Sequence, residues 1–476
     1  MIVNKSGYPT SQTSLPGRRF GIREKEASAH TSFKHVKHNV RMKISTIFTA
    51  MAACLLYGKS YSGVRSNDLS KPQKAIKVEI VKTQSGYQLL RDGKPYFVKG
   101  AGGDKYLGRL ASYGGNSIRT WSTDNAQQVL DSAQKYGLTV LMGLPAVAER
   151  HGFNYNDAVA VKKQLDRIKN EVLKFKDHPA LLGWGIGNEL NLSYKNPKVW
   201  DAVDDIAQLI HELDPNHPAT TVLAGINKSE IDYIKVKTTN IDFLSINSYG
   251  DLAELPDRVA ELGWNGPYMI TEWGPTGHWE GLSTSWNAPV EETSSEKAAV
   301  YQSRYSYSVE KDKDKCLGSY VFLWGQKQER TPTWYGLFTD KGEESEVVDV
   351  MQYLWKGKYP SNKAPHVYAF QLDGKKSNLN VQLKAGKTYS AKVVAYDPDN
   401  DKITYFWELL PEATKVGEGG DHEDKPEAAS FSFKKEGNGK ISFPSPSTAG
   451  AYRLFVYVRD GKNKVATANI PFFVNQ

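Results

Sequence analysis

Two glutamates that end apolar runs are the residues in this sequence best suited to do chemistry. Glu189 ends the run Leu182-Gly-Trp-Gly-Ile-Gly-Asn-Glu189, and Glu272 lies in Met269-Ile-Thr-Glu-Trp-Gly274. A single glutamate at the end of a strand is usually a solvated loop residue. Two carboxyl groups that face each other can cleave a glycosidic bond, because one protonates the leaving oxygen while the other attacks the anomeric carbon.

For these glutamates to meet, the elements that carry them must end at the same place. From residue 95 onward, short apolar runs alternate with longer amphipathic stretches, of which Val161–Phe175 and Val199–Leu213 have the clearest helical spacing. Glu346–Trp355 supplies the closing helix. The expected strands are Tyr96–Gly100, Asn116–Trp121, Leu138–Gly143, Leu181–Gly187, Thr220–Ala224, Ile241–Asn247, Tyr268–Thr271 and Gly318–Trp324.

Eight β–α units within about 260 residues predict an α/β fold, a (β/α)8 TIM barrel over residues 95–362. An open doubly wound sheet is the alternative, although such sheets normally stop at about five or six strands. The carboxyl ends of barrel strands face the active site. Because strands four and seven lie on opposite sides of a barrel mouth, Glu189 and Glu272 are expected to point at each other.

The flanking segments predict smaller units. Residues 63–94 form a lead-in with a hairpin made of Lys77–Val81 and Tyr87–Leu90. Residues 363–476 contain only short β-type runs separated by turn signals, as expected for a C-terminal immunoglobulin-like β-sandwich. Within it, Asp397-Pro-Asp-Asn-Asp401 alternates carboxylates as some calcium loops do, but it lacks the rest of an EF-hand pattern. We expect a polar turn there, with calcium as the alternative.

Gly187-Asn188-Glu189 and Ile270-Thr-Glu-Trp-Gly274 resemble the two signatures of clan A glycoside hydrolases, the four/seven barrels. The resemblance covers strands one to eight. It implies that Glu189 is the general acid/base and that Glu272 is the nucleophile of a retaining mechanism. It also implies that Asn188 hydrogen-bonds the 2-hydroxyl of the sugar in the reactive subsite.

Further positions fit the same pattern. The clan places an arginine beside the nucleophile, which implies that Arg119 keeps Glu272 ionised and lowers its pKa. Burial and the charge of Glu272 are expected to raise the pKa of Glu189. Tyr249 is expected to contact the nucleophile and Trp324 to floor the reactive subsite; an ordinary ion pair for Arg119 and a core position for Trp324 are the alternatives. Further expected contacts to substrate come from Trp121, Trp273 and Asp104.

The sequence offers little support for other chemistry. Gly100-Ala-Gly-Gly103 lacks the spacing of a phosphate loop, and the 10 histidines show no metal-ligand pattern, so no cofactor and no catalytic metal are expected. The net charge of +8 comes from residues 1–62, which hold ten of the 61 basic and two of the 53 acidic residues. Residues 63–476 are therefore electrically balanced, which argues against a nucleic-acid partner.

The N-terminal basic surplus has its own explanation. After Met42-Lys43, an apolar run from Ile44 to Tyr57 precedes small residues, which predicts a secretory signal peptide over residues 42–62. Residues 1–41, which precede this signal peptide, are expected to be a non-native N-terminal extension. The product is expected to be secreted or periplasmic, without a transmembrane segment in the mature chain; an outer-membrane lipoprotein acylated at Cys54 is the alternative.

The expected function is that of a secreted retaining β-glycoside hydrolase acting on a polysaccharide or oligosaccharide. The order of signal peptide, barrel and immunoglobulin-like domain is similar to that of bacterial endo-β-1,3-glucanases. The sequence motifs of the barrel also resemble those of the β-galactosidase/β-glucuronidase family. The alternatives are an exo-β-glycosidase, a β-glucan transglycosylase and, from another class, a non-catalytic glycan-binding surface protein.

Overall fold

The computed structural model describes residues 74–428 and 431–476, all of which belong to one compact unit, Leu69–Gln476. The predicted extension, the signal peptide and Cys54 lie outside the described residues. No helix in the described part of the chain is both long and apolar enough to cross a membrane.

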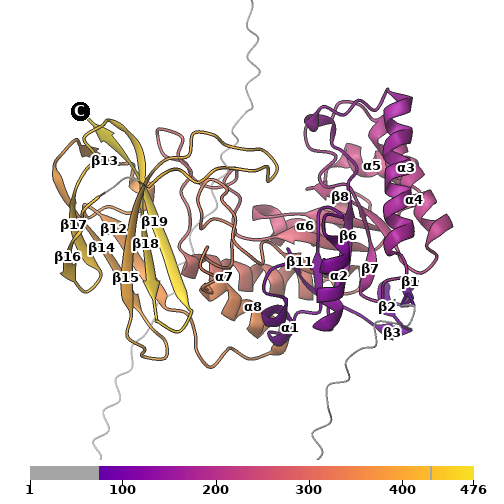
Figure 1. Cartoon of the computed structure of the whole chain (residues 1–476), viewed down its shortest axis with the longest axis horizontal. Helices are drawn as coiled ribbons and strands as arrows, with labels where there is room; N and C mark the ends of the chain where they lie inside the picture. Colours follow the sequence, from indigo (N-terminus) through magenta and orange to yellow (C-terminus); the bar gives the residue numbers. More distant parts are fainter. Residues whose placement is uncertain (1–73, 429–430) are drawn as a thin grey trace, which may run out of the picture. The chain divides into compact units, whose positions relative to one another are not determined.

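The centre of the structure is a closed barrel of eight parallel strands, in the ring order β10-β11-β4-β5-β6-β7-β8-β9 (Figure 1). This confirms the predicted (β/α)8 fold, and each expected strand appears in its expected order. The barrel strands are β4 (Val98–Gly102), β5 (Ser117–Arg119), β6 (Thr139–Leu144), β7 (Leu181–Ile186), β8 (Ala219–Ala224), β9 (Phe243–Asn247), β10 (Tyr268–Trp273) and β11 (Cys316–Val321). All strand residues except the partly exposed Lys99 and Ala224 are buried, because helices cover the outside of the barrel.

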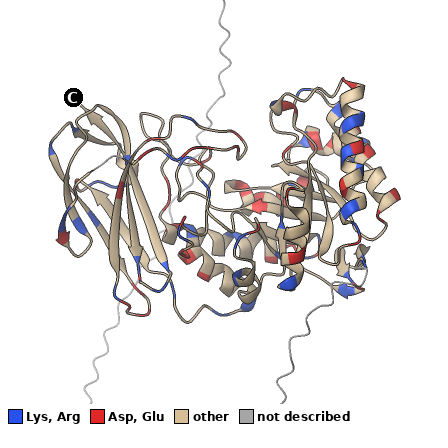
Figure 2. Ribbon diagram, in the orientation of Figure 1, with Lys and Arg blue, Asp and Glu red and all other residues tan. Residues whose placement is uncertain are grey.

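Helices follow the strands, and their ends are set by local sequence. Asp157 caps one helix by accepting hydrogen bonds from two backbone amides, and Thr293 with Glu296 forms a capping box at another. The helices are α1 (Leu107–Ser112), α2 (Ala126–Lys135), α3 (Ala158–Phe175), α4 (Lys198–Leu213), α5 (Lys228–Lys237), α6 (Leu255–Glu261), α7 (Ser294–Arg304) and α8 (Glu346–Lys356). Basic and acidic residues are interspersed along the outer helices (Figure 2).

The predicted hairpin closes the end of the barrel away from the carboxyl ends of the strands. Strands β1 (Val78–Lys82) and β2 (Tyr87–Arg91) pair antiparallel, and β3 (Lys94–Pro95) extends their sheet. Val78 and Leu89 pack into one cluster with buried barrel residues such as Leu182 and Met269. Because the hairpin covers the amino-terminal end of the barrel, we expect substrate to bind at the carboxyl ends of the strands.

The C-terminal region is a sandwich of two four-stranded sheets, ordered β12-β14-β17-β16 and β13-β19-β18-β15. Most pairs are antiparallel, but β13 pairs with β19 in parallel. The strands are β12 (His366–Leu372), β13 (Val381–Lys384), β14 (Thr388–Tyr396), β15 (Thr404–Pro411), β16 (Lys434–Gly437), β17 (Lys440–Pro444), β18 (Gly450–Arg459) and β19 (Val465–Asn475). Their inner faces enclose a second apolar core, as predicted for a sandwich.

Buried ion pairs join the sandwich to the barrel. Lys464, at the turn between β18 and β19, bonds the carboxylates of Glu344 and Asp349. Asn469 on β19 donates to Glu291 at 2.6 Å, and Lys297 of α7 pairs with the same carboxylate. These side chains are all less than one-tenth exposed, so the two parts share a polar interior.

Candidate active site

Glu272, near the end of β10, is held by three donors that lie at or just after the ends of β5 and β9. Arg119 Nη1 and Trp121 Nε1 each lie 2.7 Å from Glu272 Oε1, and the Tyr249 hydroxyl donates to Oε2 at 3.0 Å. The side chain is almost fully buried. Three hydrogen-bond donors, one of them a guanidinium, orient both oxygens of this carboxylate, and such a fixed carboxylate suits a nucleophile.

Arg119, which ends β5, links both predicted signatures. Its second guanidinium nitrogen, Nη2, donates to Asn188 Oδ1 at 2.6 Å, and Nη1 also donates to the carbonyl of Thr271 at 3.1 Å. The planar fork therefore fixes Asn188 and Glu272 relative to each other. The ion pair that was the alternative explanation for Arg119 is formed with the candidate nucleophile itself.

Glu189 is placed by an unusual backbone conformation. Its φ of 51° is left-handed, a region that costs non-glycine residues roughly 1–2 kcal/mol. Asn247 Nδ2 donates to Glu189 Oε1 at 2.9 Å, while Asn247 Oδ1 accepts from the Thr271 hydroxyl at 2.9 Å. The strained turn after β7 and this amide hold the carboxyl group at the mouth of the barrel.

The surroundings of Glu189 change its acidity. The pKa of Glu189 is raised to about 7, chiefly by burial and secondly by the negative charge of Glu272. Hydrogen bonding from Asn247 and the charges of Arg119 and Arg150 act in the opposite direction on this pKa. Near neutral pH a large fraction of Glu189 therefore carries its proton, as a general acid requires.

An aromatic cluster surrounds Glu272 on the side of β9 and β11. It consists of Tyr249, Phe322, Trp334 and Tyr335, with Trp121 packed against it. The rings meet edge to face, with Trp121 and Phe322 centroids 5.7 Å apart. Flat apolar rings beside two carboxylates suit the C–H faces of a sugar.

Three predicted substrate contacts lie elsewhere. Trp324 is fully buried against Phe338 and Trp355, so it belongs to the core between the barrel and α8 rather than to a subsite floor. Trp273 is fully buried too and packs on Tyr301 of α7, because neighbouring residues of a strand point to opposite faces. Asp104 is exposed after β4, and among the described residues no hydrogen bond or ion pair joins it to the site.

Sequence reasoning missed two side chains at the site. Asn247 bonds Glu189 from the end of β9, and Phe322 packs on Trp121 directly after β11. Asn247 carried a usable signal, because it is a polar residue at the carboxyl end of an otherwise buried strand. Phe322 lies in the run Phe322-Leu-Trp-Gly325, in which only Trp324 was expected to contact substrate.

A sandwich loop, residues 412–428 between β15 and β16, also reaches the barrel mouth. Arg150, after β6, bonds Asp421 Oδ2 and the Glu418 carbonyl, both at 3.1 Å. Ser193, after β7, donates to the Glu418 carboxylate at 3.3 Å, and Lys327, after β11, bonds the Gly420 carbonyl. Since β7 and β11 are four places apart in the ring of eight, the loop bridges opposite sides of the barrel.

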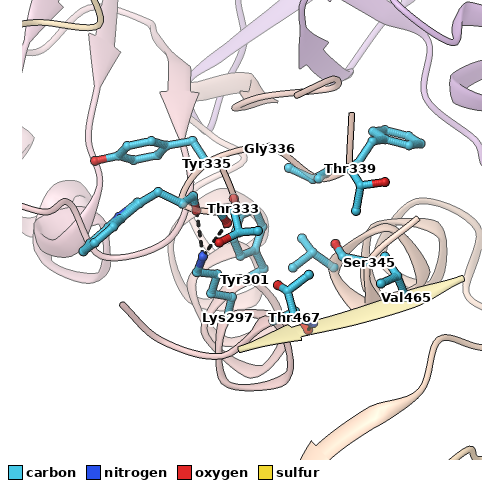
Figure 3. Close-up of a pocket in the computed structure, with 14 residues that line it drawn as sticks. Lys297, Tyr301, Thr333, Tyr335, Gly336, Thr339, Ser345, Val465 and Thr467 are labelled. Atoms are coloured by element: carbon cyan, nitrogen blue, oxygen red, sulfur yellow. Dashed lines mark hydrogen bonds between the residues drawn. The ribbon is translucent and has the colours of Figure 1, made fainter. Parts of the chain in front are cut away.

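A separate small cavity does not contain the two glutamates. It lies between α7, residues 333–339 and the start of β19, and its lining includes Lys297, Tyr301 and Thr467 (Figure 3). Lys297 Nζ bonds the carbonyls of Thr333 and Trp334 there. Because this cavity lies where α7 meets the start of β19, it is part of the joint between sandwich and barrel, and we assign the chemistry to the carboxylate pair.

Comparison with known proteins agrees with this geometry. Residues 105–325 match the family model described as glycosyl hydrolases family 2, TIM barrel domain. The β-glucuronidase of Felis catus is 26% identical over 192 residues, which cover 37% of this chain and 29% of that protein. The β-glucuronidase of Streptococcus agalactiae is 26% identical over 210 residues, covering 39% and 35% respectively.

Among solved structures, a Bacteroides uniformis β-glucuronidase aligns over 84% of this chain and 48% of its own, with 16% identity and a TM-score of 0.46. The chain spans only about a third of the length of the two curated relatives above.

The closed barrel and the match of residues 105–325 to a glycosyl hydrolase barrel domain support the predicted class of enzyme, a glycoside hydrolase, and the clan A resemblance. The expected similarity to endo-β-1,3-glucanases is not supported. The matches instead favour the β-galactosidase/β-glucuronidase type, which was the alternative.

Proposed function

We propose that the protein is a retaining exo-β-glycosidase that releases one terminal sugar from a β-glycoside. The observation that carries the proposal is the contrast between its two carboxyl groups. Glu272 accepts from three donors, one of them cationic, whereas Glu189 is buried with a pKa of about 7. Environments that separate the acidities of two carboxyl groups define an acid and a nucleophile.

In the first step, a Glu272 oxygen forms a bond to the anomeric carbon while the glycosidic C–O bond breaks. Glu189 gives its proton to the departing oxygen, so the leaving group departs as an alcohol. In the second step, Glu189 accepts a proton from water, and the water oxygen replaces Glu272 at the anomeric carbon. Two inversions give net retention. Asn188, fixed by Arg119, is placed to bond the 2-hydroxyl.

Two observations support exo action. The family match is to the barrel domain of an enzyme family whose matched relatives are named β-glucuronidases. In addition, residues 412–428 bridge loops on opposite sides of the barrel mouth, where a long glycan would otherwise pass. A loop across the barrel mouth suits binding of the end of a glycan chain rather than its middle.

Endo action on a β-glucan is the second candidate, and one surface feature favours it. Trp279 is 60% exposed, and its ring lies 5.5 Å from that of Tyr249, which bonds the nucleophile. An exposed indole next to the reactive subsite can stack on a further sugar unit.

The test is hydrolysis of p-nitrophenyl β-glucuronide, β-galactoside and β-glucoside beside reducing-sugar release from laminarin. Exo action predicts turnover of one aryl glycoside and only monosaccharide from any oligosaccharide; oligosaccharide products from laminarin would favour the endo candidate. Glu272→Ala should abolish turnover, and azide should restore it with an α-glycosyl azide as product. Glu261→Ala, at an exposed position on α6, is the matched control. A glycan-binding protein would show binding without turnover in every arm.

We also propose that residues 42–62 direct export and are then removed. N-terminal sequencing of the protein recovered from the medium or periplasm tests this. A mature chain that starts shortly after residue 62 is expected, whereas a lipid-modified Cys54 at the N-terminus would establish the lipoprotein alternative.

A further inference from the structure

Three aspartates of the sandwich converge near its junction with the barrel. Asp397 and Asp401 lie in the turn between β14 and β15, and Asp460 lies in the turn between β18 and β19. One carboxylate oxygen from each can be chosen so that all three lie within 4.8 Å of one another. Two oxygens on opposite sides of a calcium ion lie about 5 Å apart, since each Ca–O distance is about 2.3–2.6 Å.

The hydrogen bonds to the Asp397 carboxylate reach only one of its two oxygens. The residue is only 7% exposed, and its Oδ1 accepts from the backbone amides of Asp399 and Asp401 at 2.9 and 3.1 Å. Its Oδ2 is buried and has no hydrogen-bond partner in the structure, and the same holds for Asp401 Oδ2. Buried carboxylate oxygens without a donor are costly, because they have lost water and gained nothing in return.

Neighbouring lysines do not neutralise the negative charge of these three carboxylates. Lys462 Nζ contacts Asp401 Oδ1 at 2.6 Å, but its side chain is 59% exposed and lies at the rim. Lys363 pairs with Asp399 instead. The carboxylate of Asp460 accepts only from neutral groups, namely two backbone amides and the Asn362 side chain. Three carboxylates thus share one exposed ammonium group.

We propose that Asp397, Asp401 and Asp460 bind a calcium ion. The available donors are all oxygens, as a hard cation requires, and no histidine or cysteine belongs to the group. The ion takes up the two unpartnered carboxylate oxygens and completes its shell with water. This site is independent of the glycosidase chemistry, since it lies in the sandwich and uses none of the residues around Glu189 and Glu272.

The site would also stiffen the junction between the two parts of the chain. Asn362, which bonds Asp460 at 2.7 Å, belongs to the segment that connects α8 to β12. The turn that carries Asp460 also carries Lys464, which is buried against Glu344 and Asp349. Calcium therefore joins the connecting segment and two turns of the sandwich at one point.

The test uses the full chain, freed of divalent ions with a chelator and titrated with CaCl2 by calorimetry. We expect about one ion per chain, with a Kd of about 1 mM or tighter, as for extracellular calcium modules. The thermal transition should rise by about 5 °C at a hundredfold excess of calcium over Kd. Asp397→Asn and Asp401→Asn should each weaken binding at least tenfold.

Asp373→Asn is the matched control, because Asp373 lies in a sandwich turn after β12, outside the group. It should bind calcium as the unsubstituted protein does. The proposal is overturned if the unsubstituted chain neither binds CaCl2 nor gains thermal stability. It is equally overturned if both Asp397→Asn and Asp401→Asn retain full binding, or if MgCl2 binds and CaCl2 does not.

Discussion

The guanidinium of Arg119 forms an ion pair with the carboxylate of Glu272, with Nη1 2.7 Å from Oε1 and both side chains less than one-tenth exposed. The pair joins the ends of β5 and β10 across the barrel mouth. Because Arg119 also holds Asn188, one side chain orients both the candidate nucleophile and the candidate 2-hydroxyl ligand.

Replacing Arg119 should therefore impair catalysis. Arg119→Met leaves a buried carboxylate without its cation, and we expect kcat to fall about 100- to 1,000-fold, as when a preorganised donor is removed. Arg119→Lys keeps the charge but loses the fork, so an intermediate loss is expected. Circular dichroism checks that each variant is folded. An unchanged kcat in folded Arg119→Met would rule out this role.

The role of Glu189 as acid can be tested with leaving groups of different acidity. Glu189→Gln should lower kcat about 100- to 10,000-fold for an alkyl β-glycoside, whose leaving oxygen needs a proton. A 2,4-dinitrophenyl glycoside needs little protonation, so its glycosylation step should lose far less. Equal losses for both substrates would show that Glu189 does not protonate the leaving group.

The pH profile should report the raised pKa of Glu189. The acid form is the active one, so kcat/KM should decline as pH rises above about 7. Asn247 donates to the carboxylate and thereby lowers this pKa. Asn247→Ala should consequently move the basic limb to higher pH, and a limb that stays in place or moves down would contradict the assignment.

The loop over residues 412–428 should control substrate size. Asp421→Ala removes the carboxylate that Arg150 and His151 bond, and we expect a higher KM for the aryl glycoside with a modest change in kcat. Asp424→Ala is the control in the same loop, because Asp424 contacts only His422 of that loop. Equal KM values for the two variants would mean that the loop does not shape the pocket.

The buried ion pairs of Lys464, which join the barrel and the sandwich, should contribute strongly to the free energy of unfolding. Lys464→Met leaves Glu344 and Asp349 buried without their cation, which should cost about 3–5 kcal/mol in the free energy of unfolding. Lys162→Met, in an exposed pair on α3, should have little effect. Urea denaturation measures both, and similar midpoints for the two variants would refute the prediction.

Much of this architecture could be predicted from the sequence, because barrel strands and helices leave strong periodic signals. The alternation of short apolar runs with helical stretches predicts that Glu189 and Glu272 lie at the mouth, because each ends a strand of a (β/α)8 barrel. Period-two alternation also predicts that Trp273, next to inward-facing Glu272, points outward, which is the opposite of the substrate contact expected of it. Trp324 lies beyond the last residue of β11, where no periodicity applies.

Other features could not be predicted because they depend on contacts between distant segments. Nothing around Asp421 indicates that it meets Arg150, which lies 271 positions earlier in the chain. The same is true of Lys464 and its two carboxylate partners. In the turn after β14, the alternating carboxylates were visible, but only the packing shows that two of their oxygens are buried without a donor.

The loop that bridges the barrel mouth has a consequence for how such a chain can be engineered or can diverge. The contacts of residues 412–428 with Arg150, Ser193 and Lys327 cannot be kept when the C-terminal part is exchanged, so the sandwich is not an interchangeable appendage. A chimaera with a foreign C-terminal half would inherit the two glutamates but not the loop that crosses the barrel mouth. Its substrate preference should then differ from that of the donor of the barrel, although the catalytic residues are the same.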